Sequence, residues 1–149
     1  VMALLRNPQQ LTKLRSRPEL MANTVEEILR FDTSVTDTGR IANRDIEIDG
    51  VKIARGESLT LCVAAANRDP AAYDEPNRFD IERVDTHHQS FGGGRHFCMG
   101  AHLARLEVSE ALIALLDRFP KLSLGRGGYE YASNPSFRGL EEFWLSKEA

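Results

Sequence analysis

Apolar residues recur at helical spacing in three parts of the chain, residues 9–17, 23–31 and 101–119. A stripe of apolar side chains among polar ones is typical of a helix that packs one face against a core. In the second stretch Thr24 is followed three residues later by Glu27, the spacing of a capping box, so we expect Thr24 to cap that helix. The third stretch ends at a proline and predicts the longest helix of the chain.

Between residues 40 and 63 the apolar pattern changes to alternation, which is typical of strands. Asp49 and Gly50 lie within this stretch, and that pair of residues favours a hairpin turn. Residues 74–90 are rich in turn-forming residues and predict an irregular loop, whereas short apolar pieces after residue 121 predict terminal strands. We therefore expect a mainly α-helical chain with small β-sheets, an α+β fold.

The composition excludes two classes of protein. The chain has 149 residues, of which 42% are hydrophobic and 28% charged, with a net charge of -3. It has no basic stripe for nucleic acid, and no apolar run approaches the roughly 20 residues that cross a bilayer. We expect a cytoplasmic protein with no membrane or nucleic-acid partner. The chain opens on apolar residues that resemble the end of a helix, without a capping residue, so we expect upstream sequence to be missing.

The two cysteines lie in different surroundings. Cys62 belongs to an apolar run, whereas Cys98 follows three glycines and immediately precedes the longest predicted helix. A helix N-terminus offers partial positive charge and free N–H groups, which favour a metal-bound thiolate at Cys98. Glycines permit positive φ angles and let the backbone approach a flat ligand. A disulfide between the two cysteines is not expected.

Two other interpretations of Cys98 remain open at this point. A single cysteine is often a small buried apolar residue with no chemical role. A zinc site is also conceivable, because His96, Cys98 and His102 lie close in sequence and His87 and His88 precede them. The spacing of these residues does not follow the paired ligand pattern of structural zinc sites.

Residues 91–100, Phe-Gly-Gly-Gly-Arg-His-Phe-Cys-Met-Gly, resemble the cysteine-ligand loop of the cytochrome P-450 family. The resemblance implies that Cys98 is the proximal thiolate ligand of haem b, iron protoporphyrin IX. It further implies that Phe91 shields the sulfur, that Arg95 lies near the haem edge, and that His96 and Arg40 bind the two haem propionates. For Arg40, a surface arginine at a strand edge is an equal alternative. The remaining fixed positions of the loop are the glycines Gly92, Gly94 and Gly100.

The same resemblance implies a structural triad. Glu27 and Arg30 lie one helical turn apart, and Arg78 follows in a Pro-Asn-Arg-Phe segment like one that the family carries. By itself, a glutamate and an arginine at this spacing are more often a solvated surface pair. The family pattern implies that Glu27, Arg30 and Arg78 form a buried network between helix and loop.

The resemblance extends over residues 1–149 and implies the C-terminal, haem-binding part of a cytochrome P-450, with the N-terminal half absent. The implied function is a monooxygenase that inserts one oxygen atom into a small organic substrate, using a ferredoxin-type redox partner. The alternative is a truncated, catalytically incompetent module, either without haem or binding haem without turnover. Surfaces exposed by truncation favour self-association.

Overall fold

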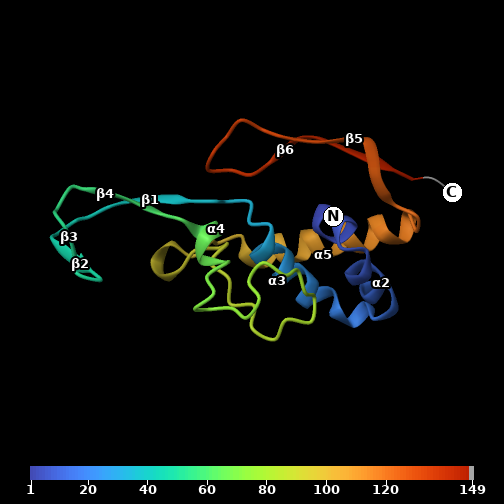
Figure 1. Cartoon of the computed structure of the whole chain (residues 1–149), viewed down its shortest axis with the longest axis horizontal. Helices are drawn as coiled ribbons and strands as arrows, with labels where there is room; N and C mark the ends of the chain where they lie inside the picture. The colour runs from blue at the N-terminus through green and yellow to red at the C-terminus, as the bar shows by residue number, and fades with distance from the viewer. Residues whose placement is uncertain (148–149) are drawn as a thin grey trace.

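The helical stretches of the sequence fold into a group of helices that bury one apolar face each. The structure is a computed structural model that describes residues 1–147. Helix α5 is the longest and packs along α3, while α1 and α2 lie beside them (Figure 1). The helices are α1 (Met2–Arg6), α2 (Pro8–Ser16), α3 (Met21–Phe31), α4 (Val63–Ala66) and α5 (Ala101–Arg118), with short 3-10 turns η1 (Pro18–Leu20) and η2 (Gly94–His96).

Helix α3 begins earlier than its capping pattern suggests. Its first residue is Met21, because Leu20 before it already has helical backbone angles and η1 runs into α3 without a break. Thr24 lies inside the helix, where its hydroxyl donates to the carbonyl of Leu20 at 2.9 Å. The prediction that Thr24 caps this helix is therefore wrong.

The strands within residues 1–147 pair in antiparallel two-stranded ladders. The predicted hairpin turn is confirmed, because Asp49 and Gly50 both have positive φ angles, 46° and 79°, between two paired strands. Such a turn matches the natural twist of the strands that it joins. The ladders pair β1 (Thr38–Ile41) with β4 (Ser58–Leu61), β2 (Ile46–Ile48) with β3 (Val51–Ile53), and β5 (Ser123–Tyr131) with β6 (Leu140–Ser146).

The core lies where α1, α2, α3 and α5 meet the irregular loop that follows α4. Leu4, Val25 and Ile81 are almost fully buried there, and Leu112 of α5 packs against them. The predicted loop is confirmed, since no helix or strand of the described chain lies between Ala66 and Gly94. The side chains of Phe79 and Ile81, which belong to this loop, are buried against the helices. The loop is therefore ordered by packing rather than by regular backbone hydrogen bonds.

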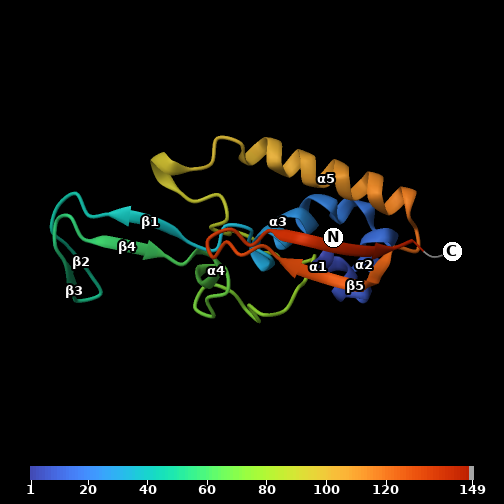
Figure 2. The same ribbon diagram turned by 90° about the horizontal axis from the view of Figure 1, so that it is seen from above.

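The molecule is elongated. The ladders β1/β4 and β2/β3 extend away from the helices at one end, and β5/β6 runs across the helical part (Figure 2). The fold is mainly helical with small sheets, as the sequence predicts. Within residues 1–147 no helix is long and apolar enough to cross a membrane.

Candidate functional site

The glycine-rich segment forms a closed loop before α5. Gly92 and Gly94 have φ angles of 67° and 61°, which residues with a Cβ rarely adopt. The backbone N–H of Cys98 donates to the carbonyl of Phe91 at 2.9 Å, and the carbonyl of Cys98 accepts the N–H of Ala101 at 3.2 Å. These two bonds hold Cys98 between the start of the loop and the first turn of α5.

Cys98 is an exposed, free thiol at the N-terminal end of α5. A Cβ placed on Gly100, the residue before the helix, would lie 3.9 Å from the Cys98 sulfur. Phe97 and Met99 flank the cysteine, and their side chains are 47% and 101% exposed. Exposed apolar side chains gathered at one place are typical of a surface that binds a ligand or another chain segment.

A pocket of about 470 Å³ lies beside this loop. Gln89, Gly92, Gly93 and His96 form its wall on the loop side, and residues of β1, β4 and α4, with Cys62 between β4 and α4, form the rest. Arg40 also lines this pocket, so the structure brings together the two side chains predicted to bind propionates. The remaining lining residues are mostly apolar or small: Thr38, Leu61, Val63 and Ala66.

The residues of this pocket fit a haem group. A flat apolar macrocycle needs apolar walls and a close backbone approach, which Val63, Leu61 and the glycines provide. Its carboxylates need cations or N–H donors at the rim, which Arg40 and His96 provide. Arg40 now donates to the hydroxyl of Thr38 and to the carbonyl of Gly39, at 3.0 and 2.7 Å.

The other predicted site residues fall around the same loop. Arg95 is exposed in η2, next to His96. The ring of Phe91 is half-buried, and it lies 6.4 Å from the ring of Phe97, edge to face. The Phe91 carbonyl, rather than its ring, makes the observed contact with Cys98.

The histidines do not assemble with Cys98 into a zinc site. Within residues 1–147 no three side chains of His, Cys, Asp or Glu gather as metal ligands. His88 is turned inward, with its Nε2 atom 3.3 Å from a carboxylate oxygen of Glu26 in α3. The zinc interpretation therefore finds no support in the arrangement of these side chains.

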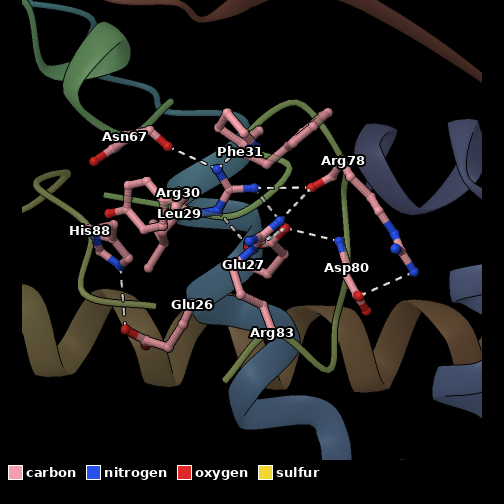
Figure 3. Close-up of polar contacts among 12 residues, drawn as sticks. Glu26, Glu27, Leu29, Arg30, Phe31, Asn67, Arg78, Asp80, Arg83 and His88 are labelled. Atoms are coloured by element: carbon pink, nitrogen blue, oxygen red, sulfur yellow. Dashed lines mark hydrogen bonds and ion pairs between the residues drawn. The ribbon is translucent and has the colours of Figure 1, made fainter. Parts of the chain in front are cut away.

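A buried ion pair joins α3 to the loop that precedes the cysteine. Arg30 binds both carboxylate oxygens of Glu27, at 2.7 and 2.8 Å, and both side chains are 0% exposed (Figure 3). The Arg30 guanidinium also donates to the carbonyls of Asn67, Pro76 and Arg78, at 2.8, 2.9 and 3.1 Å. The guanidinium N–H groups of Arg30 that face the loop are therefore paired with oxygen atoms.

The prediction that the Arg78 side chain is the third member of this network is wrong. The Arg78 side chain is 55% exposed and pairs with Glu75 and Asp80, at 2.8 and 3.4 Å. Arg83 takes its place, with its Nε atom 3.3 Å from a carboxylate oxygen of Glu27 and its side chain 10% exposed. A turn closed between Asp80 and Arg83 reverses the chain and sends Arg83 back toward α3.

Arg78 serves the network through its backbone instead. Its carbonyl accepts from Arg30 and from Arg83, at 3.1 and 3.0 Å, while its side chain points away (Figure 3). The one sequence signal for the correct residue is a second arginine five positions later in the same loop. No local pattern distinguishes the two arginines, because the loop's path decides which one turns inward.

Sequence reasoning also missed a buried polar cluster around Asn67. Its amide nitrogen donates to the hydroxyls of Thr33 and Ser90, at 2.7 and 2.9 Å, and its oxygen accepts the N–H of Gln89 at 2.7 Å. The Ser90 hydroxyl donates to the carbonyl of Leu29 in α3 at 2.6 Å. Asn67 and Ser90 thus tie the start of the cysteine loop to α3.

The chain is similar to proteins of one family. A sequence model of the cytochrome P-450 family matches residues 5–126. Over 148 residues the chain is 46% identical to the biotin biosynthesis cytochrome P-450 of Bacillus subtilis (strain 168), covering 99% of this chain and 38% of that protein. It is 52% identical over 126 residues to the putative cytochrome P-450 140 of Mycobacterium tuberculosis (strain ATCC 25618 / H37Rv), covering 84% of this chain and 29% of that protein.

Solved structures show the same likeness. The chain superposes on P-450BioI, crystallised in complex with a hexadec-9Z-enoic acid ligated acyl carrier protein, with a TM-score of 0.95 and 44% identity. The match covers 99% of this chain and 38% of that one. CYP109E1 from Bacillus megaterium, in complex with testosterone, gives a TM-score of 0.96 at 30% identity, covering 99% and 41%. The chain therefore spans well under half the length of these relatives.

Proposed function

This chain belongs to the cytochrome P-450 family, and on that premise we propose that residues 1–149 form the C-terminal, haem-binding part of a haem-thiolate monooxygenase. The match to the family covers residues 5–126, and the structural likeness extends over almost the whole chain. Cys98 is the proposed ligand of the haem iron. The observation that carries the proposal is an exposed thiol on a closed glycine loop, beside an apolar pocket bordered by Arg40 and His96.

Each side chain of the site has a separate proposed task. Cys98 supplies a thiolate, which the N-terminal end of α5 stabilises through its partial positive charge. Arg40 and His96 bind the carboxylates of haem b at the rim of the pocket. Phe91 and Arg95 border the sulfur and the haem edge, and Gly92, Gly94 and Gly100 allow the backbone to pass close to the macrocycle. When bound here, a haem iron supplies the activation of dioxygen.

The partners and the location of the complete protein are proposed by analogy. One relative, 48% identical over 122 residues, is named 6-deoxyerythronolide B hydroxylase, from Saccharopolyspora erythraea. We propose a small organic substrate, a ferredoxin-type electron donor and a cytoplasmic location. P-450BioI is recorded with an acyl carrier protein. An acyl substrate presented by such a carrier is a further candidate for this chain.

The test is an absorption spectrum of the protein after haem addition, reduced under carbon monoxide. A thiolate ligand produces a strongly red-shifted Soret band, and we expect this band in the wild type and not in Cys98→Ala. Cys62→Ala is the matched control, because Cys62 is the other free thiol and lines the pocket without being the proposed ligand. A red-shifted band that persists in Cys98→Ala would overturn the assignment of the ligand.

A second proposal concerns the 149-residue polypeptide by itself. It spans 38% of the length of the biotin biosynthesis relative, and the pocket beside the cysteine loop is open to solvent. Water that reaches the iron from an open face prevents controlled oxygen chemistry. We therefore expect this polypeptide, produced alone, to be inactive as a monooxygenase even where it binds haem, whereas the complete protein turns over. Substrate oxidation by the isolated polypeptide would contradict this.

A further inference from the structure

The segment leading into the cysteine loop contains a buried histidine that the proposed function does not use. The side chain of His88 is 2% exposed. Its Nδ1 atom accepts the backbone N–H of Ser90 at 3.2 Å, so the proton of the neutral ring lies on Nε2. That nitrogen faces Glu26 at 3.3 Å without a well-aligned hydrogen bond (Figure 3). Burial lowers the pKa of His88 below its ordinary value, against the opposing effect of Glu26.

Glu26 connects this histidine to the helix after the cysteine. Arg105 of α5 binds both oxygens of the Glu26 carboxylate, at 2.6 and 2.8 Å. The pairing with Arg105 holds the pKa of Glu26 below its ordinary value. Helix α3, helix α5 and the start of the cysteine loop therefore meet at one carboxylate.

Phe91 is held from two directions by the same groups. The His88 and Phe91 rings have centroids 5.6 Å apart, and the guanidinium carbon of Arg105 lies 4.6 Å from the centre of the Phe91 ring. The Phe91 carbonyl in turn accepts the N–H of Cys98 at 2.9 Å. A shift of Phe91 would therefore move the backbone that carries the thiol.

We propose that His88 is a positioning residue for Cys98. Its two nitrogens, which face Glu26 and the Ser90 N–H, anchor the imidazole ring. The anchored ring and Arg105 clamp Phe91, whose carbonyl fixes the backbone of the cysteine. Its role as a clamp on the loop rests on these contacts alone, whereas its effect on an iron ligand rests on the proposed function. His88 is buried by residues of this chain, so the contacts do not depend on any further segment.

The variants can be chosen so that the protein still folds. Ser90 and Asn67 tie the same loop to α3 through their own hydrogen bonds, and these remain when His88 is changed. His88→Phe keeps an aromatic ring against Phe91 but removes both nitrogens, so the ring loses its anchors to Glu26 and to the Ser90 N–H. His88→Gln keeps an N–H that can reach Glu26. His87→Phe is the matched control, because His87 is the exposed neighbour.

The first measurement is hydrogen exchange at the Cys98 amide in the protein without haem. We expect exchange about five-fold faster in His88→Phe, because local opening of the loop becomes easier, and partial restoration in His88→Gln. His87→Phe should exchange like the wild type. Equal exchange in His88→Phe and His87→Phe would overturn the proposal.

The second measurement is the rate at which the reduced, carbon monoxide-bound protein loses its red-shifted Soret band. We expect this loss about five-fold faster in His88→Phe than in His87→Phe, with His88→Gln between them. A general loss of stability would not be rescued by glutamine, which lacks the ring. If the wild type shows no red-shifted band, the proposed function fails, while the exchange measurement still decides whether His88 clamps the loop. Equal rates in all variants would refute an effect on the ligand.

Discussion

At the scale of single residues, Glu27 and Arg30 form an ion pair in which both side chains are fully buried. Water is excluded from both side chains, and the carbonyls of the loop complete the pairing. A buried ion pair contributes little net stability, but the loss of one partner leaves an uncompensated charge. The pair therefore specifies how the loop sits on α3 more than it strengthens the fold.

Glu27→Ala tests the burial of this network. We expect the free energy of unfolding to fall by about 3–5 kcal/mol, because Arg30 is left buried without its carboxylate. Glu75→Ala is the control, since Glu75 pairs with an exposed arginine. Urea unfolding of both variants measures the difference. Equal stability of Glu27→Ala and the wild type would show that the network is solvated.

Arg83 and Arg78 give a direct comparison of the two candidates for the third position. Arg83→Met should destabilise the protein more than Arg78→Met, because only the Arg83 side chain reaches Glu27. Both changes keep an unbranched side chain of similar length, and both leave the Arg78 carbonyl in place. Thermal unfolding midpoints measured under the same conditions provide the ranking. The reverse ranking would return Arg78 to the network.

The pH dependence of stability reports on His88. The pKa of His88 in the folded protein is lowered from its ordinary value of about 6.5, first by burial and then by the Arg105 charge, while Glu26 opposes the shift. The unfolded chain thus binds more protons at mildly acidic pH. The stabilisation from neutral His88 is complete above about pH 6.5 and is lost as the pH falls toward the lowered value. We expect the slope of unfolding free energy against pH in this window to be shallower in His88→Gln.

At the scale of elements, the cysteine loop depends on glycine at particular positions. Gly94 has a φ of 61° and open space where a Cβ would lie, so backbone strain is the cost of a side chain there. Gly93 is extended, with a φ of -155°, and a Cβ would find only an ordinary contact with Gln89 at 3.9 Å. Gly93 also lines the pocket, so the control for Gly94 is Gly139, where a Cβ would meet no atom within 4 Å.

Gly94→Ala should disfavour the loop conformation by about 1–2 kcal/mol, the cost of a left-handed residue with a side chain. Haem affinity should fall by about ten-fold, since 1.4 kcal/mol corresponds to that factor. Gly139→Ala should change affinity little, because Gly139 lies outside the pocket. Haem titration followed by absorption measures both variants. Similar affinities for the two would show that the loop adapts when haem binds.

At the scale of the whole molecule, much apolar surface faces outward. Leu103, Leu106 and Ile113 of α5 are exposed, and so are Ile41 and Leu61 of the β1/β4 ladder. A two-stranded ladder is marginal in water by itself, and a helix that is apolar beyond its buried stripe needs a second covering. These surfaces are suited to contact with further chain or with a second copy.

We expect the 149-residue polypeptide to self-associate when it is produced alone, because exposed apolar patches favour association. Leu106→Lys should shift sedimentation toward the monomer. Glu107→Lys is the control, since Glu107 is exposed on the same helix and the change also adds positive charge. A monodisperse monomer for the unchanged polypeptide would contradict the prediction.

The sequence by itself determined the features that depend on neighbours along the chain. Periodicity was sufficient for the main helices, the Asp49 and Gly50 pair for the turn, and short apolar pieces for the terminal strands. These features follow from local backbone preferences and one buried face. The likeness of residues 91–100 to one family singled out Cys98, and the glycines with positive φ lie where that pattern has them.

Only the tertiary structure decided which distant side chains meet. Arg83 rather than Arg78 reaches Glu27, and His88 turns inward to Glu26, because the irregular loop after α4 follows a path set by packing against the helices. Arg40 and His96 line one pocket although β1 and the cysteine loop lie far apart in sequence, so the fold alone brings them together. Where such side chains are buried, each charge pairs with another group of the protein, because water does not reach it.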